Sequence, residues 1–150
     1  MALLTPELLA NIGKRAAPRR EIATRRDIRK YSVATAQTDP RFLAGDVAPP
    51  LYHVALFWDV VPLEALTPDG VSVDTLLPKL PRERAMAGGL NIEYHQQIKA
   101  DDVLIANRTL TNLYEKEGRS GTLIFYEIVM EVATESGAQV LTETTTRLLR

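Results

Sequence analysis

The recurrence of an apolar residue at every second position from 124 to 132 is the feature that most constrains how this chain can fold. The polar positions of this stretch include Glu127 and Glu131, so one face of the segment is predicted to meet solvent or a polar neighbour. A period of two is the period of a β-strand with one buried face. The apolar residues that share the other face are Ile124, Tyr126, Ile128, Met130 and Val132.

Three further stretches carry a similar strand pattern. Residues 90–98 alternate after Gly88-Gly89, residues 103–114 form a second candidate, and residues 139–149 form a threonine-rich last one. Residues 115–121 and Ser136-Gly137 are predicted to be the turns between them. Strands of ten or more residues exceed the usual length, so the sheet is expected to curve around something.

The object inside the sheet is predicted to be the apolar block from Leu51 to Val61, which is long enough for a buried helix. A long antiparallel sheet wrapped around one helix is the hot-dog arrangement, an α+β fold. Residues 63–87 carry several prolines and are predicted to be a loop with a helical turn or two.

The N-terminal part contains two helix-start signals. Thr5-Pro6-Glu7 combines a capping hydroxyl, a proline suited to the first turn and an acidic side chain. Thr24 to Asp27 has the spacing of a capping box, with aspartate in place of glutamate. Arg19 to Thr24 is predicted to be a short edge strand between these helices.

Composition bounds the function classes. The 150 residues are expected to form one domain over 1–150, hiding roughly 70% of the unfolded chain's surface. A net charge of −1 gives no field that would attract nucleic acid. The absence of cysteine excludes disulfides and thiolate zinc sites. Neither a secretory signal nor an apolar run of membrane-spanning length is present, so a soluble cytoplasmic protein is expected.

The chain resembles the N-terminal-type domains of the MaoC-like hydratase and dehydratase family. The stretches that carry the resemblance occur in order between about residues 5 and 149: "VAPPLYHV", "GGLNIEYHQQIKADD" and "LYEKEGRSGTLIFYEIVMEV". Active members of that family carry a segment of the type Gly-Asp-x-Asn-Pro-(Leu/Ile)-His after a helix. Its aspartate and histidine hold the water that adds to, or leaves, an enoyl thioester, which is general acid–base chemistry.

Aligned with that pattern, this chain has the residues of the turn but lacks the catalytic aspartate and histidine. Ala36 falls at the glycine, Asp39 at the asparagine and Pro40 at the proline, whereas Gln37 replaces the catalytic aspartate and Phe42 the histidine. Glutamine accepts no proton near neutral pH, and phenylalanine neither donates nor accepts one. The resemblance therefore implies a chain with no catalytic residue of its own.

The resemblance further implies a substrate-supporting subunit of an enoyl-thioester hydratase or 3-hydroxyacyl-thioester dehydratase. The catalytic Asp and His would lie on a MaoC-like partner, and the two chains would form a double hot-dog heterodimer. The substrate would be an acyl-CoA or an acyl-carrier thioester, and no cofactor or metal is implied. A homodimeric acyl-thioester binding module without catalysis is the alternative.

Candidate substrate-binding residues lie in the apolar block and at one predicted turn. Phe57 and Trp58 are suited to contact an acyl chain, although filling the core would use the same residues. Arg119 is suited to a phosphate of coenzyme A or of a pantetheine arm, although a solvated turn would have the same composition. The full set of candidates is Leu51, Tyr52, Phe57, Trp58 and Arg119.

His53 and His95 are the two histidines of the chain. A packing or capping role is favoured for His53, and a structural or partner-contacting role for His95. A third function is a hot-dog thioesterase, in which either histidine would work with a carboxylate such as Glu64 or Glu93. It ranks last, because neither histidine lies in a recognisable acid–base constellation of the sequence.

Overall fold

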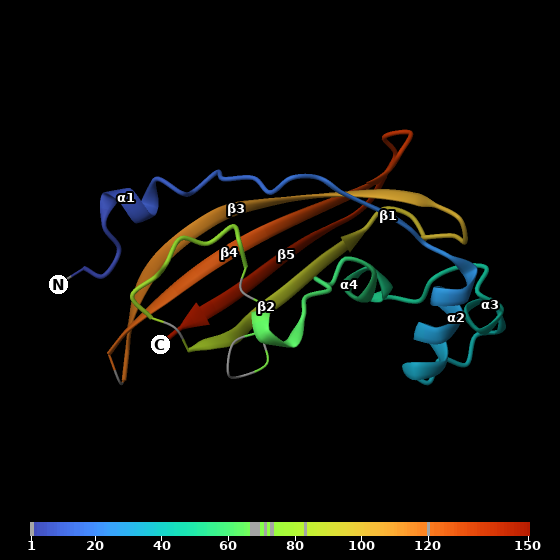
Figure 1. The fold of residues 1–150 in the computed structure, drawn as a ribbon, viewed down its shortest axis with the longest axis horizontal. Coiled ribbons are helices and arrows are strands. Elements are labelled where there is room, and N and C mark those ends of the chain that lie inside the picture. Colours follow the sequence, from blue (N-terminus) through green and yellow to red (C-terminus); the bar gives the residue numbers. More distant parts are fainter. Residues whose placement is uncertain (1, 67–69, 71, 73, 83, 120) are drawn as a thin grey trace.

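The computed structural model describes residues 2–66, 70, 72, 74–82, 84–119 and 121–150. Helices precede the long strands along the chain, as the sequence predicts (Figure 1). The elements are α1 (Pro6–Leu9), β1 (Arg19–Ile22), α2 (Arg25–Ala34), α3 (Pro40–Ala44), α4 (Tyr52–Leu56), the 3-10 turn η1 (Leu63–Ala65), β2 (Ala85–Tyr94), β3 (Val103–Gly118), β4 (Gly121–Thr134) and β5 (Gln139–Leu149).

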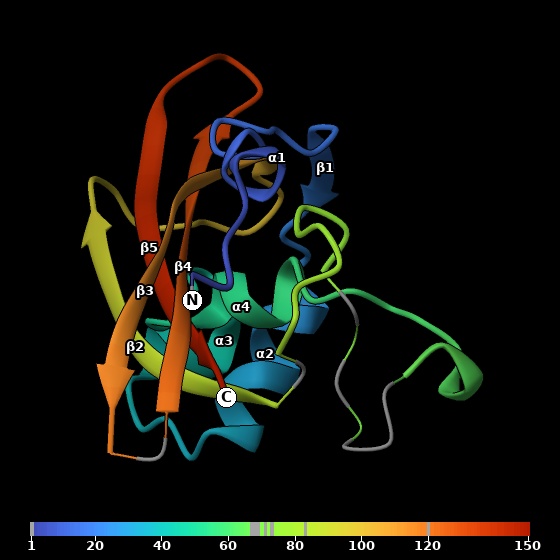
Figure 2. The same ribbon diagram turned by 90° about the vertical axis from the view of Figure 1, so that its left-hand side faces the viewer.

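The strands form one antiparallel sheet in the order β1-β3-β4-β5-β2. Figure 2 shows the curved sheet on one side of the molecule, with α2, α3 and α4 on the other. The short β1 and the ten-residue β2 are the two edges of this sheet. The predicted α+β arrangement, a long sheet with helices on one face, is confirmed.

The face of β4 that the alternation predicts to be buried is buried, from Ile124 to Val132. Its side chains contribute to two separate core clusters. Met130 and Val132 pack with α2 and α4, whereas Ile124 and Ile128 pack with the N-terminal segment and with residues 76–80. Different segments thus cover the two ends of the inner face of the sheet. The part of this face between the two clusters is left uncovered.

Both helix-start signals are confirmed by the caps they form. The Thr5 hydroxyl accepts a hydrogen bond from the Leu8 amide, and the Thr24 hydroxyl accepts one from the Asp27 amide at 3.1 Å. None of the described helices is long and apolar enough to cross a membrane.

The prediction of a helix over the whole apolar block is wrong. Helix α4 is five residues long, and beyond it Trp58 is 57% exposed and Val60 is 99% exposed. Arg19 explains the early end, because its guanidinium donates to the Phe57 carbonyl at 2.7 Å and to the Asp59 carboxylate at 2.6 Å. These contacts hold the chain in an extended path. A helix that continued here would need the Phe57 carbonyl as the acceptor of a backbone hydrogen bond.

Two predicted strands also need new boundaries. Strand β2 begins at Ala85 and ends at Tyr94, short of the predicted end at 98, so the glycine pair lies inside it, where the pairing with β5 shifts between Ala87 and Gly89. Strand β3 continues through most of the predicted turn to Gly118, and Lys116 there lies over the rings of two aromatic residues. Charged residues at 115–117 made the segment resemble a loop, although cross-strand contacts with β4 stabilise it as a strand.

Candidate functional site

The turn between α2 and α3 keeps a conformation that glycine would adopt most readily. Ala36 has φ 53°, in the left-handed region, at the position where the family pattern has glycine. The next amide, of Gln37, donates to the Ser32 carbonyl at 2.9 Å, and the Gln37 side chain donates to the Thr35 hydroxyl at 3.3 Å. The turn is therefore a defined structure that contains no carboxylate at position 37.

Asp39 serves this turn as a helix cap. Its carboxylate accepts from the Arg41 amide at 2.8 Å, which begins α3, and pairs with the Arg41 guanidinium at 2.8 Å. The hydrogen bonds from the Arg41 side chain and backbone hold the pKa of Asp39 below its ordinary value. A carboxylate held in this way is a poor proton carrier, and Phe42 is half-buried beside it without an ionisable group.

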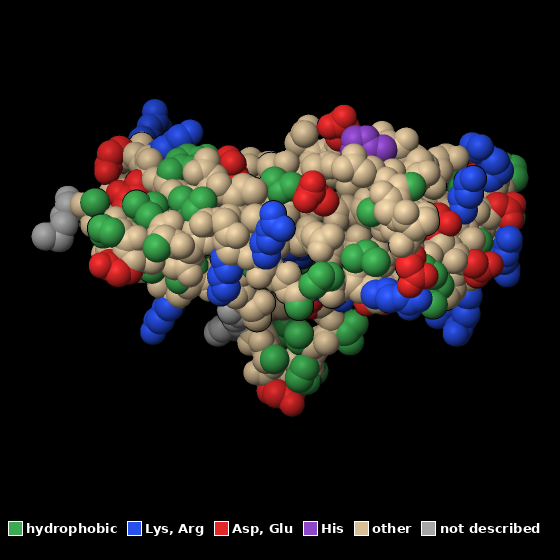
Figure 3. All heavy atoms as spheres, turned by 90° about the horizontal axis from the view of Figure 1, so that it is seen from above, with side chains coloured by type: hydrophobic (Ala, Val, Ile, Leu, Met, Phe, Trp, Pro, Cys, Tyr) green, Lys and Arg blue, Asp and Glu red, His purple; other side chains and the backbone are tan. Residues whose placement is uncertain are grey.

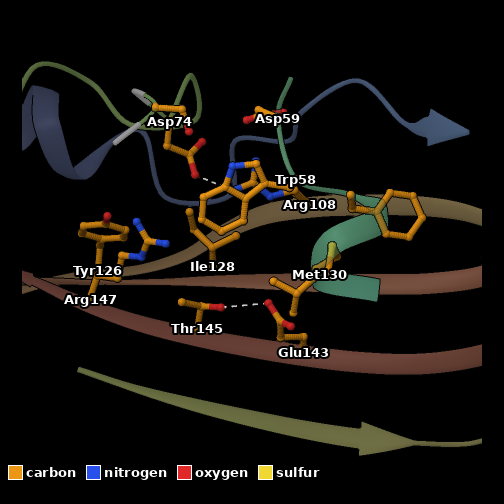
Figure 4. A pocket seen from close by; sticks show the side chains of 13 residues that line it. Trp58, Asp59, Asp74, Arg108, Tyr126, Ile128, Met130, Glu143, Thr145 and Arg147 are labelled. Carbon is orange, nitrogen blue, oxygen red and sulfur yellow. Dashed lines mark hydrogen bonds and ion pairs between the residues drawn. The ribbon is translucent and has the colours of Figure 1, made fainter. Parts of the chain in front are cut away.

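A pocket of about 160 Å³ lies over the inner face of β4 and β5, between the two core clusters (Figure 4). Val54, Phe57 and Trp58 line it from one side, and Ile128 and Met130 form its apolar floor. A cavity of about 150 Å³ accommodates a molecule of the size of benzene, so a short acyl group would fit here. The pocket exists because α4 ends at Leu56 and leaves this part of the sheet uncovered.

Polar side chains from three strands enter the same pocket. Arg108 of β3 forms an ion pair with Asp74, and Thr145 donates to the Glu143 carboxylate at 3.0 Å (Figure 4). Arg147 points into the pocket beside Tyr126. Burial raises the pKa of Tyr126, although the charge of Arg147 opposes that rise. The middle of the inner face is therefore polar between apolar ends.

His53 and Glu143 form a buried hydrogen-bonded pair, which is an ion pair when the imidazole is protonated. The distance from His53 Nε2 to Glu143 Oε2 is 2.6 Å, and their side chains are 1% and 12% exposed. Burial would raise the pKa of Glu143, but the hydrogen bond and charge of His53 offset it and leave that pKa below its ordinary value. The pair ties α4 to β5, which lies 90 positions further along the chain.

His53 also borders a second cavity, of about 350 Å³, which lies between the start of α4 and residues 94–98. His95 lines this cavity and is exposed, with its Nε2 3.4 Å from the Thr142 hydroxyl. Glu64 lies on η1 and Glu93 on β2, both exposed. Of the residues described here, neither of these glutamates contacts a histidine, so the predicted carboxylate partners of His53 and His95 are not brought to them.

The predicted substrate-binding residues separate into different places. Phe57 and Trp58 line the pocket together. Leu51 is 42% exposed and accommodates a left-handed φ of 67°, with its amide donating to the Tyr94 hydroxyl at 3.0 Å. Tyr52 packs in the core, edge-to-face with Tyr31, and Arg119 is exposed at the turn after β3.

Sequence reasoning missed the polar residues that line the pocket, although β5 carries the signal. Glu143, Thr145 and Arg147 have the same parity as Leu141 and Leu149, and both leucines are buried on the inner face. Residues of one parity on a strand share a face. Extending the period-two analysis to this threonine-rich segment would have placed the three polar side chains inside.

Basic side chains gather at the end of the molecule that α2 and α3 form (Figure 3). Arg25 there pairs with Asp46, and Arg41 pairs with Asp39. Arg26, Arg29 and Lys30 line an open surface depression together with the exposed Val33. This surface is separate from the pocket over β4 and β5.

The fold is that of a hot-dog domain, and comparison with known proteins gives the family to which the domain belongs. The family model described as "FAS1-like, dehydratase domain region" matches residues 10–143, so the chain belongs to that family. The resemblance to MaoC-like hydratases and dehydratases is thereby confirmed.

Individual relatives are distant. Mesaconyl-C(4)-CoA hydratase of Chloroflexus aurantiacus is 28% identical over 85 residues, which are 56% of this chain and 30% of the hydratase. This chain thus matches less than a third of the length of that enzyme. The ChsH1-ChsH2 complex of Mycobacterium tuberculosis contains a similar fold, with TM-score 0.69, 13% identity, and 95% and 86% of the two chains aligned. A MaoC-like dehydratase from Phytophthora capsici aligns with TM-score 0.65 and 19% identity over 98% of this chain and 49% of its own.

Proposed function

We propose that this chain is the substrate-supporting subunit of an enoyl-thioester hydratase or 3-hydroxyacyl-thioester dehydratase, and that a partner subunit carries the catalytic Asp and His. The observation that carries the proposal is the α2–α3 turn. Its backbone follows the family pattern through the left-handed Ala36 and the capping Asp39, while Gln37 and Phe42 remove the acid–base groups. Conserving the turn without its chemistry is consistent with a structural and substrate-contacting role.

The pocket over β4 and β5 supports the binding half of this proposal. Phe57, Trp58 and the apolar floor would contact the acyl group, while the thioester would extend toward the partner. Arg119 is a candidate contact for a phosphate of the carrier.

The edge strand β2 supports the need for a partner. Long exposed edges are normally covered or paired, and β2 presents a ten-residue edge. Met86, Leu90 and Tyr94 on this strand are between 43% and 52% exposed. A second hot-dog sheet docking here would pair the edge and cover these side chains. The ChsH1-ChsH2 complex, a heteromeric assembly with this fold, is consistent with that arrangement.

The test is to co-express the chain with a catalytic MaoC-like subunit encoded beside it and to assay hydration of trans-2-enoyl thioesters. We expect activity in the complex alone, which is lost when the partner's catalytic aspartate is replaced and kept when Gln37→Ala or Phe42→Ala is introduced here. Hydration by the isolated chain at the rate of the complex would contradict the proposal. A stable homodimer that binds thioesters and activates no partner would instead favour the binding module.

A further inference from the structure

The carboxylates that line the pocket over β4 and β5 all have partners. There are three of them among the lining residues. Asp74 pairs with Arg108, and Asp59 pairs with Arg19 at 2.6 Å. Glu143 is bound to His53, also at 2.6 Å.

Arg147 is the arginine of the pocket that has no such ion pair among the described residues. It lines the pocket from β5 and is half-buried, and no carboxylate of the described residues lies within ion-pairing distance of it. Figure 4 shows its guanidinium at the end of the pocket next to Tyr126, with Ile128 between it and Trp58. A guanidinium at the end of a small, partly apolar cavity is a suitable partner for a carboxylate, because its planar donors match that group in pairs.

We propose that this pocket selects a short acyl thioester whose acyl group ends in a carboxylate, with Arg147 as the specificity-determining residue. The inference deepens the proposed function and rests on it for the reaction, but not for the binding. The volume of about 160 Å³ restricts the acyl group to a few carbons. Ile128 and Met130 contact its methylene groups, and Arg147 binds the distal carboxylate.

The first experiment compares two ligands that differ only at the distal group. Succinyl-coenzyme A and butyryl-coenzyme A both carry four-carbon acyl groups, the first ending in a carboxylate and the second in a methyl group. Calorimetric titration of the chain, alone and in its complex, is expected to show roughly tenfold or tighter binding of succinyl-coenzyme A, the size of one charge-assisted hydrogen bond. Equal binding, tighter binding of butyryl-coenzyme A, or no binding of succinyl-coenzyme A would overturn the proposal.

Variants assign the preference to one side chain. Arg147→Gln is expected to abolish the preference by weakening the binding of succinyl-coenzyme A roughly tenfold, and Arg147→Lys to restore part of it. Arg20→Gln is the matched control, because Arg20 is exposed and pairs with Glu135 away from the pocket. A preference that survives Arg147→Gln in a variant whose circular dichroism and melting temperature match wild type would assign it to another group and overturn the role of Arg147.

Measurements of turnover distinguish a failure of this inference from a failure of the proposed function. A complex that hydrates crotonyl-coenzyme A but gains nothing from a distal carboxylate would retain the proposed function and overturn the inference. A chain that prefers succinyl-coenzyme A through Arg147 but supports no hydration with any partner would keep the binding preference and overturn the proposed function.

Discussion

The α2–α3 turn and the junction of α4 with β5 use polar residues in opposite ways. At the turn, where relatives of this family place their acid–base residues, the chain has a glutamine and a phenylalanine around a capping Asp39. At the junction it has a buried His53–Glu143 hydrogen-bonded pair. The difference teaches that this chain places its histidine–carboxylate contact away from the turn, where the contact joins a helix to a strand and Glu143 also lines the pocket.

The largest effect is expected from breaking the buried pair. Glu143→Ala or His53→Ala leaves the other side chain buried without its hydrogen-bond partner, at a cost of about 3 kcal/mol in the free energy of unfolding. This is the low end for buried pairs, because Glu143 still faces the pocket. Urea denaturation monitored by circular dichroism measures it.

The double variant His53→Leu/Glu143→Met replaces the pair by two apolar side chains of similar size. It is expected to be more stable than either single alanine variant, since no buried charge remains. Glu131→Ala is the control, because Glu131 is exposed on the opposite face of the sheet, and its effect is expected within about 0.5 kcal/mol. Single variants as stable as wild type would mean that the pair does not hold α4 to the sheet, and the contrast with the turn would disappear.

A smaller effect of opposite sign is expected at the turn. Ala36 holds a left-handed conformation that costs a residue with a Cβ on the order of 1 kcal/mol. Ala36→Gly is therefore expected to stabilise the chain by about 0.5–1 kcal/mol, less the added entropy of the unfolded state. Thermal and urea denaturation check it.

Ala34→Gly is the matched control for that substitution. It lies two residues earlier, at the last residue of α2, where glycine is expected to destabilise the chain by up to about 0.5 kcal/mol. If both substitutions destabilise the chain equally, the turn does not store the strain that its backbone indicates, and the argument that it keeps the family geometry is weakened.

The sequence predicted the parts of the fold that depend on local pattern. The buried face of β4 followed from the alternation over 124–132, and the starts of α1 and α2 followed from Thr5 and Thr24. The interpretation of Gln37 and Phe42 as replacements of catalytic residues came from aligning the chain with the family pattern, and it stays a prediction. In each case the necessary information lies within a few residues along the chain.

What the sequence did not predict depends on contacts between distant residues. The length of α4 was overestimated because Arg19, which binds the carbonyl of Phe57, lies 38 positions away. The partner of His53 was sought in Glu64 and Glu93, whereas Glu143 lies 90 positions away and reaches it only through the pairing of the sheet. Hydrophobic period and turn signals carry no information on such pairs.

The smallest effect is expected in the pH dependence of stability. Because the pKa of Glu143 in the folded chain lies below its ordinary value of 4.5, the unfolded chain binds more protons in acid than the folded chain does. The contribution of Glu143 is therefore complete above pH 4.5 and is lost as the pH falls through its folded pKa. The effect is small because burial opposes the influence of His53 on the same carboxyl.

The measurement is the difference in unfolding free energy between wild type and Glu143→Gln from pH 7 to pH 3. This difference is expected to be constant down to about pH 4.5 and to narrow below it, whereas the difference for Glu131→Gln should have no such step. A difference that widens in acid would mean that the pKa shift of Glu143 has the opposite sign. Burial would then outweigh the influence of His53 and raise the pKa of Glu143. The carboxyl would then be protonated more readily than in water, and the junction, unlike the turn, would contain a group able to donate a proton into the pocket.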